Sequence, residues 1–234
     1  MTSPRRITSA TLALMGLGAI HLPASAQPLA WSDEVSLGSD LSERGISLWP
    51  GVAVAQALGA VSDAATWSAT LSAARPLGSG EGSRGSQLVA RGAGYLALSP
   101  DWQLQGRLGA YAYPGMGVRQ YDRTEATLGM AYRDLVSLEL SASRLHDESS
   151  HWYPAYDLGL RWPLSARWAL AAGVGSAELP NWPGTHYRYA DVGVAWHAGA
   201  WRASLSRLGA SGEARRFVGD AAGPRTVLGL TRAF

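Results

Sequence analysis

Three absences limit what this chain can be. It has no cysteine, so it has neither a disulfide framework nor a thiolate metal site. It has no lysine, and setting aside Arg5 and Arg6 leaves 18 of its 20 basic residues against 18 acidic residues, so no basic stripe indicates nucleic-acid binding. After residue 30 no apolar run reaches the roughly 18 residues that a membrane-spanning helix needs.

Residues 1–26 have the pattern of a secretory signal peptide. A basic start containing Arg5 and Arg6 is followed by an apolar stretch, and Ala24-Ser25-Ala26 forms an A-x-A cleavage signal. The alternative is a buried N-terminal helix, which this three-part pattern disfavours. We therefore expect cleavage near Ala26 and an exported domain spanning residues 27–234.

The exported part alternates between apolar and polar or small residues with a period of two. In residues 136–143, for example, Leu138 and Leu140 alternate with Ser137 and Glu139. Such alternation predicts strands with one apolar face and one polar face. Twelve strands are predicted, near 33–42, 52–61, 65–75, 86–99, 101–113, 121–133, 135–146, 155–163, 166–177, 186–197, 200–208 and 225–234.

The connections between these strands alternate in length. Five are short, and six are long and often rich in Gly and Pro, including 43–51, 76–85 and 209–224. An even number of antiparallel strands with short periplasmic turns and longer external loops is typical of bacterial outer-membrane barrels. The predicted fold is therefore an all-β, transmembrane, up-and-down antiparallel barrel of about twelve strands with six longer external loops.

Aromatic residues occur in two groups along these strands, and amphipathic rings favour the two membrane interfaces. We expect a belt near the short turns, formed by Trp67, Trp102, Trp162, Trp168, Trp196, Trp201 and Phe234. We expect a second belt at the long-loop ends, formed by Trp49, Trp152, Trp182, Tyr113, Tyr121, Tyr153 and Tyr187. A sandwich of two sheets would show the same alternation, but it would bury the apolar faces.

Several segments resemble the TorF-type family of bacterial outer-membrane porins. They are "VSLGSDLSERGIS" (35–47), "YAYPG" (111–115), "YDRTEATLGMAY" (121–132), "LVSLELSAS" (135–143) and "VLGLTRAF" (227–234). Leu41 departs from the aromatic residue expected after Asp40, and Arg232 from the apolar residue usual two places before the end. The resemblance implies a Gram-negative outer-membrane location and a porin role. The final Phe234 also resembles the signal by which the barrel-assembly machinery recognises the C-terminal strand.

The inward positions of a twelve-stranded barrel decide whether its lumen conducts, because side chains fill smaller barrels and larger ones hold channels. Parity predicts a polar pore lining of Arg91, Gln103, Gln105, Arg107, Arg123, Glu125, Arg133, Glu139, Asp157, Arg161, Asp191 and Arg202, with Tyr95, Tyr111, Tyr187 and Tyr189 also inward. The leading hypothesis is a narrow water-filled channel for passive diffusion of small polar solutes, weakly anion-preferring because inward arginines outnumber inward acids. The same charges could instead pair across the lumen and form a closed plug.

Two other function classes stay open at this point. The segment 144–153 contains His146, Asp147, Ser149, Ser150 and His151 in one external loop, with His186 as a further candidate, which are ingredients of a hydrolytic site. The loops 76–85 and 212–220 could bind a partner in a structural or adhesive role. We nevertheless expect no enzyme, no cofactor and no metal site; the expected partners are outer-membrane lipid, the barrel-assembly machinery and small polar solutes.

Overall fold

The computed structural model describes residues 29–63, 66–78, 80, 84–116, 121–146 and 151–234. The signal peptide predicted for residues 1–26 lies outside this part. No helix among the described residues has the length and apolar character needed to cross a membrane.

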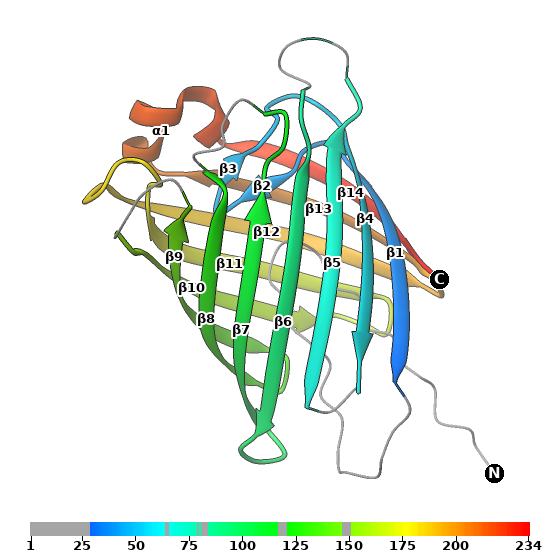
Figure 1. Ribbon diagram of the computed structural model, residues 1–234. Coiled ribbons are helices and arrows are strands. Elements are labelled where there is room, and N and C mark those ends of the chain that lie inside the picture. The colour runs from blue at the N-terminus through cyan, green and yellow to red at the C-terminus, as the bar shows by residue number, and fades with distance from the viewer. Residues whose placement is uncertain (1–28, 64–65, 79, 81–83, 117–120, 147–150) are drawn as a thin grey trace, which may run out of the picture.

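Twelve antiparallel strands form one closed barrel (Figure 1). Each strand pairs with its neighbours along the chain, and β1 closes the ring by pairing with β14 from Glu34↔Ala233 to Gly38↔Gly229. The strands are β1 (Ala30–Gly38), β4 (Val54–Ser62), β5 (Trp67–Pro76), β6 (Gln87–Ala97), β7 (Trp102–Ala112), β8 (Arg123–Tyr132), β9 (Val136–Leu145), β10 (Tyr153–Pro163), β11 (Trp168–Glu178), β12 (His186–Ala198), β13 (Trp201–Ala210) and β14 (Arg225–Ala233). The predicted fold class and strand number are confirmed.

The apolar residues of the strands lie on the outer surface of the barrel. Leu71 is 65% exposed and Leu108 is 64% exposed, whereas Ser72 and Gln105, on the opposite parity of the same strands, are buried. A sandwich of two sheets would bury the leucines, so that alternative is wrong. Alternation in the sequence thus becomes an apolar outer surface around a polar interior.

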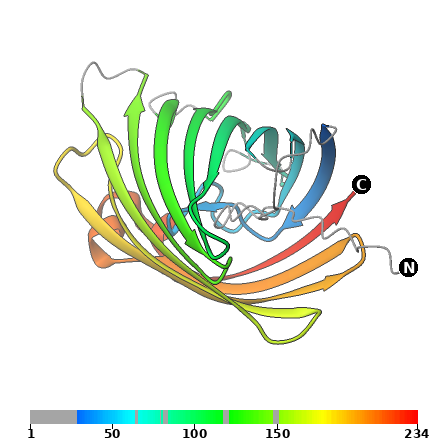
Figure 2. The same cartoon turned by 90° about the horizontal axis from the view of Figure 1, so that it is seen from below.

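The first long connection was predicted to be an external loop, and that prediction is wrong. Residues 42–47 form a two-stranded hairpin, β2 (Ser42–Glu43) and β3 (Ile46–Ser47), which lies inside the ring of strands (Figure 2). Arg44 and Gly45 form its tip with positive φ angles of 48° and 79°. Its charged residues form ion pairs with opposite charges on the inner wall of the barrel, which stabilises the inward position of the hairpin.

The last long connection was predicted as a loop and instead contains helix α1 (Gly212–Val218) and a 3₁₀ helix (Gly219–Ala222). Ser211 occupies the N-cap position, and Glu213 in the first turn complements the helix dipole. Ala214 and Ala222 are fully buried in a cluster with Leu179 and Tyr187. This packing fixes α1 over the end of the barrel where the long connections lie, called here the long-loop end (Figure 1).

The belt predicted near the short turns lies on the outer surface. Trp67, Trp102, Trp162, Trp168 and Trp201 are 39–55% exposed, Phe234 is 69% exposed, and Trp196 is partly covered on the same outward parity. The guanidinium of Arg232 lies 4.8 Å from the ring centre of Phe234 and 5.5 Å from that of Trp201. Arg232 therefore stacks on the belt instead of interrupting it.

The prediction of a second aromatic belt, at the long-loop end, is largely wrong. Four of its seven members, Trp49, Tyr113, Tyr153 and Tyr187, are at most 4% exposed and pack within the long-loop end. Trp152 remains 50% exposed, and Trp182 and Tyr121 are partly covered. Leu48, which follows the hairpin, packs with Trp49 and Tyr113, and Ala214 of α1 packs in the cluster that contains Tyr187.

Candidate functional site in the barrel lumen

A cavity of about 250 Å³ occupies the lumen. Ser68, Tyr95 and Ser137 line it near the short-turn ends of β5, β6 and β9, and the hairpin tip borders it from the long-loop side. Its charged lining residues are Glu34, Glu43, Arg44, Arg91, Arg107, Arg123, Glu125, Glu139, Asp157 and Asp191. A cavity this polar and this large holds several water molecules.

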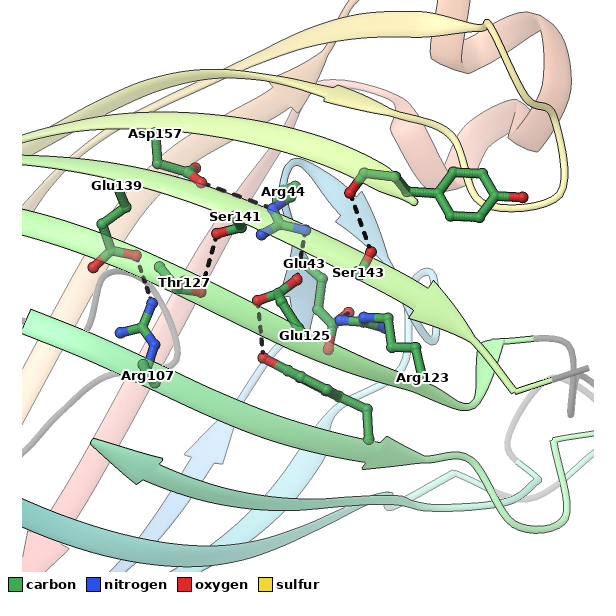
Figure 3. A network of polar contacts seen from close by, with 12 residues as sticks. Glu43, Arg44, Arg107, Arg123, Glu125, Thr127, Glu139, Ser141, Ser143 and Asp157 are labelled. Atoms are coloured by element: carbon green, nitrogen blue, oxygen red, sulfur yellow. Dashed lines mark hydrogen bonds and ion pairs between the residues drawn. The ribbon is translucent and has the colours of Figure 1, made fainter. Parts of the chain in front are cut away.

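The hairpin tip is bound to the wall through two residues of opposite charge (Figure 3). Arg44 Nη1 lies 2.9 Å from Glu125 Oε2 on β8, and Arg44 Nε lies 3.8 Å from Asp157 Oδ2 on β10. The neighbouring Glu43 accepts a hydrogen bond from Arg123 Nη2 at 2.7 Å. Adjacent residues of the tip thus bind opposite charges, which fixes the register of the hairpin in the lumen.

Uncharged donors and close packing also hold the tip. Tyr113 donates its hydroxyl to Glu43 at 3.1 Å, and Gln87 donates to the same carboxylate. Gly45 lies so close to the far wall that an added Cβ would be 2.8 Å from Tyr189 Cβ and 2.9 Å from the carbonyl oxygen of Gly209. With its positive φ, this position suits only glycine.

The hairpin is anchored to β14 both at its base, through Asp40, and at its tip, through the backbone of Gly45. Arg225 Nε donates to Asp40 Oδ2 at 2.5 Å, and its Nη2 donates to the carbonyl oxygen of Gly45 at 2.9 Å. Asp40 also accepts hydrogen bonds from Ser42, at 2.6 Å, and from Ser47. The hairpin therefore has a base fixed by Asp40 and a tip held by the ion pairs of Glu43 and Arg44 together with hydrogen bonds, including that from Arg225 to Gly45.

Further charges pair along the wall itself. Arg107 Nη2 lies 2.5 Å from Glu139 Oε2, and Gln105 donates to the other oxygen of that carboxylate at 2.9 Å. Arg202 lies 3.2 Å from Glu34 between β13 and β1. These pairs stabilise charges on the wall without closing the lumen.

Two of the charged lining residues, Arg91 and Asp191, form no ion pair among the described residues. Arg91 on β6 donates only to the hydroxyl of Tyr111, at 3.1 Å, and Asp191 on β12 has no hydrogen-bond or ion-pair partner there. The two strands lie six places apart in the ring of twelve, on opposite walls. Both charges border a cavity large enough for water, and a charged group without a protein partner requires such hydration.

Apolar side chains fill the long-loop end of the lumen. Trp49 packs with Val54 and Ala74 on one side, and Tyr113 packs with Val89 on the other. A second cavity of about 80 Å³ continues beside the hairpin along β1, β13 and β14. It shares lining residues with the main cavity, namely Ser36, Leu41, Ser42, Gln56 and Leu208.

Of the twelve residues predicted to line a pore, eight border the main cavity: Arg91, Gln105, Arg107, Arg123, Glu125, Glu139, Asp157 and Asp191. Gln103 is buried on the inward face of β7, and Arg202 is buried against Glu34. Arg161 is exposed at the short-turn end of β10. Arg133 lies in the turn after β8, where its guanidinium binds Asp101 at 2.6 Å, so it borders the rim and not the wall.

Three charged lining residues were missing from the prediction. Glu34 has the inward parity of β1, and alternation with Val35 and Leu37 could have identified it. Glu43 and Arg44 lie in a connection without alternation, so no pattern in the sequence places them inside. With these three residues included, and with Arg133, Arg161 and Arg202 outside the lining, the cavity has six carboxylates against four guanidinium groups.

The hydrolytic residues considered in loop 144–153 do not form one cluster among the described residues. His146 Nε2 lies 3.0 Å from Thr124 Oγ1 on the outward face of β8, whereas His151 Nε2 lies 2.8 Å from Glu178 Oε1. His186 is exposed at the start of β12, and Asp147, Ser149 and Ser150 lie outside the described residues. No group of three or more metal-ligating side chains occurs in the described part of the chain.

Solved outer-membrane porins share this architecture. The KdgM porin superposes with a TM-score of 0.59 at 6% identity, over 87% of this chain and 99% of that chain. The NanC porin superposes with a TM-score of 0.57 at 9% identity, over 86% of this chain and 98% of that chain. The chain has the fold of these porins. No family model matches its sequence, and no curated protein matches it.

Proposed function

We propose that this protein is an outer-membrane channel for small polar solutes, in which the hairpin β2–β3 forms the constriction. The observation that carries the proposal is the charged cavity of about 250 Å³ inside a closed barrel whose outer face is apolar. Charges in a lumen require water or a partner. A hydrated, charged lumen offers polar solutes a path that the surrounding hydrocarbon does not.

The contacts of the hairpin favour a movable constriction over a permanent plug. Its tip is held by Glu43 and Arg44 through side-chain ion pairs and hydrogen bonds, which water or a charged solute can replace. The second cavity follows the hairpin toward the long-loop end and shares Ser36 and Ser42 with the main one. Displacing the tip would join this route to the main cavity.

The lining also sets the expected ion preference. Six carboxylates and four guanidinium groups border the cavity, so the excess charge is negative. Rings of carboxylates favour cations. In place of the anion preference expected from the sequence, we propose a weak preference for cations.

The remaining sequence-based expectations support the same placement. An apolar outer face, a belt of tryptophans at the short-turn end and the expected signal peptide are consistent with insertion in the outer membrane of a Gram-negative bacterium. Recognition by the barrel-assembly machinery through the strand ending at Phe234 stays a prediction, as does the resemblance to the TorF-type porins.

Planar-bilayer recording tests this function. The chain from residue 27, refolded in detergent and inserted into a bilayer, should give discrete conductance steps, and a salt gradient should produce a reversal potential of the sign for cation preference. Folding is checked in parallel by the heat-dependent shift of the barrel on an electrophoresis gel. A folded barrel without conductance steps would contradict the channel and support the plugged alternative.

A further inference from the structure

The outward-facing charges of the strands are distributed unevenly between the two ends of the barrel. At the long-loop end the exposed outward charges are all arginines: Arg75 on β5, Arg144 on β9, Arg188 on β12 and Arg207 on β13. Among the described strands, the acidic residue with outward parity at this end is Glu178, on β11. It is buried and accepts hydrogen bonds from His151 and from the backbone of Gly184. At the short-turn end, Asp33 and Arg232 balance each other in sign.

The arginines are densest where β12 and β13 meet helix α1. Ser211, at the N-cap of α1, donates its backbone N–H to the carbonyl of Arg188 at 2.8 Å, so Arg188 lies at the base of the helix. Arg207 lies on the adjacent strand, and Arg215 and Arg216 are exposed on α1. We call Arg188, Arg207, Arg215 and Arg216 the arginine rim. Glu213 lies within reach of the charges of Arg216 and Arg188 and offsets part of theirs.

The arginine rim directly adjoins the apolar outer surface of β12 and β13. Arg207 pairs in register with Val192, which is 50% exposed, and the next outward residue on its strand, Leu205, is 47% exposed. Phe217 on α1 is 43% exposed and contacts Trp182 with ring centres 5.4 Å apart. An apolar surface that ends at a row of guanidinium groups matches a lipid, whose acyl chains end at a charged headgroup.

The guanidinium groups retain donors for such a headgroup. Arg207 donates Nη1 to Thr226 Oγ1 at 3.2 Å, and neither Arg188 nor Arg207 has a carboxylate within ion-pair distance among the described residues. The planar guanidinium fork matches the oxygens of a phosphate and can bind two of them at once. A phosphate at this depth would also be poorly hydrated on its membrane side, which strengthens the contact.

We propose that the arginine rim binds the phosphate groups of lipids in the leaflet at the long-loop end. The occupant is a phosphorylated membrane lipid whose acyl chains lie along β12 and β13. The proposal rests on the membrane location given under the proposed function, but not on conduction, so the two are tested separately.

Lipid binding is measured on the refolded barrel in a zwitterionic detergent. The probe is a glycolipid carrying two phosphates, compared with the same glycolipid after enzymatic removal of the phosphates and with inorganic phosphate alone. The test variant is Arg188→Gln/Arg207→Gln. The control is Arg232→Gln, which removes an outward arginine from the opposite end of the barrel. Conductance of each variant is recorded in parallel.

We expect the barrel to bind the phosphorylated glycolipid and the double variant to bind it about thirtyfold more weakly, since each arginine near a charged membrane surface contributes about a fivefold factor. Arg232→Gln should bind it like the unmodified barrel. Removing the lipid phosphates should weaken binding as the double variant does. If the double variant does not fold, the two single variants carry the comparison, each with about a fivefold loss.

Several results would overturn the proposal. They are equal binding of the phosphorylated and dephosphorylated glycolipids, unchanged binding by the double variant, or an equal loss in Arg232→Gln. Binding of inorganic phosphate as tight as that of the lipid would show an anion site without a lipid surface. A barrel that conducts without binding the lipid would refute the arginine rim and leave the channel intact.

Discussion

Replacing Arg44 by alanine tests whether the hairpin is the constriction. Arg44 holds the tip through Glu125 at 2.9 Å and Asp157 at 3.8 Å, with its own side chain 22% exposed and that of Glu125 7% exposed. The substitution leaves the base anchored, because the Asp40–Arg225 contact is untouched. Glu43 keeps its hydrogen bond from Arg123, so we expect the tip to be released from the wall more often while the barrel stays folded.

The expected magnitude follows from these contacts. Two charges about 4 Å apart attract by about 4 kcal/mol at an effective dielectric constant of 20. Removing one partner of a buried pair costs about 3–5 kcal/mol, and the partial exposure of Arg44 to the lumen places its loss at the lower end of that range. A loss of about 3 kcal/mol lowers the ratio of bound to released tip roughly a hundredfold.

Single-channel recording in planar bilayers measures this change. Arg44→Ala should increase the fraction of time spent at high conductance. The matched control is Arg107→Ala, which removes an arginine of equal size paired with Glu139 at 2.5 Å on the wall, without touching the hairpin. Unchanged traces for Arg44→Ala, or the same change for both variants, would refute the assignment of the hairpin as the constriction.

Three further substitutions test separate parts of the structure. Gly45→Ala should increase the time spent at high conductance without altering any charge, because its Cβ would be 2.8 Å from Tyr189 Cβ at a positive φ. The control is Gly51→Ala, which is also at a positive φ but has nothing within 4 Å of its added Cβ. Equal traces for the two variants would argue against steric release of the hairpin. Asp191→Asn should shift the reversal potential toward anions by removing a carboxylate that has no partner among the described residues, and an unchanged potential would place Asp191 off the ion path. Asp101→Asn should lower the urea midpoint at pH 7, because the hydrogen bond from Arg133 holds the pKa of Asp101 below its usual range. That stabilisation is present above the ordinary aspartate pKa of about 3.9 and is lost as the pH falls through the lower folded value, so the two midpoints should converge in acid; a difference that persists there would contradict the ion pair as its cause.

The wall of the barrel was predictable because its information is local. A strand that separates lipid from water must alternate, and the alternation of Leu138 and Leu140 with Ser137 and Glu139 reports both the strand and the direction of each side chain. The same parity placed Gln105, Arg107 and Glu125 on the inner surface, where the structure has them.

The contents of the lumen were not predictable in this way. Glu43 and Arg44 lie in a connection with no periodicity, and their position depends on partners that are distant in sequence: Arg123, Glu125 and Asp157. Trp49 and Tyr113 were predicted as interfacial aromatics, but Leu48, Met116 and the ends of the strands bury them inside the barrel. Helix α1 likewise forms because the end of the barrel offers Ala214 an apolar surface, which local sequence does not reveal.

The sequence by itself determined the barrel, its strand number and the inward or outward direction of the wall residues, since the pleat of a strand imposes a period of two on any chain that faces two solvents. Only the tertiary structure decided what closes the lumen and which charge prevails there. Those depend on long-range pairing of single residues across the barrel, and such pairing leaves no periodic trace in the chain.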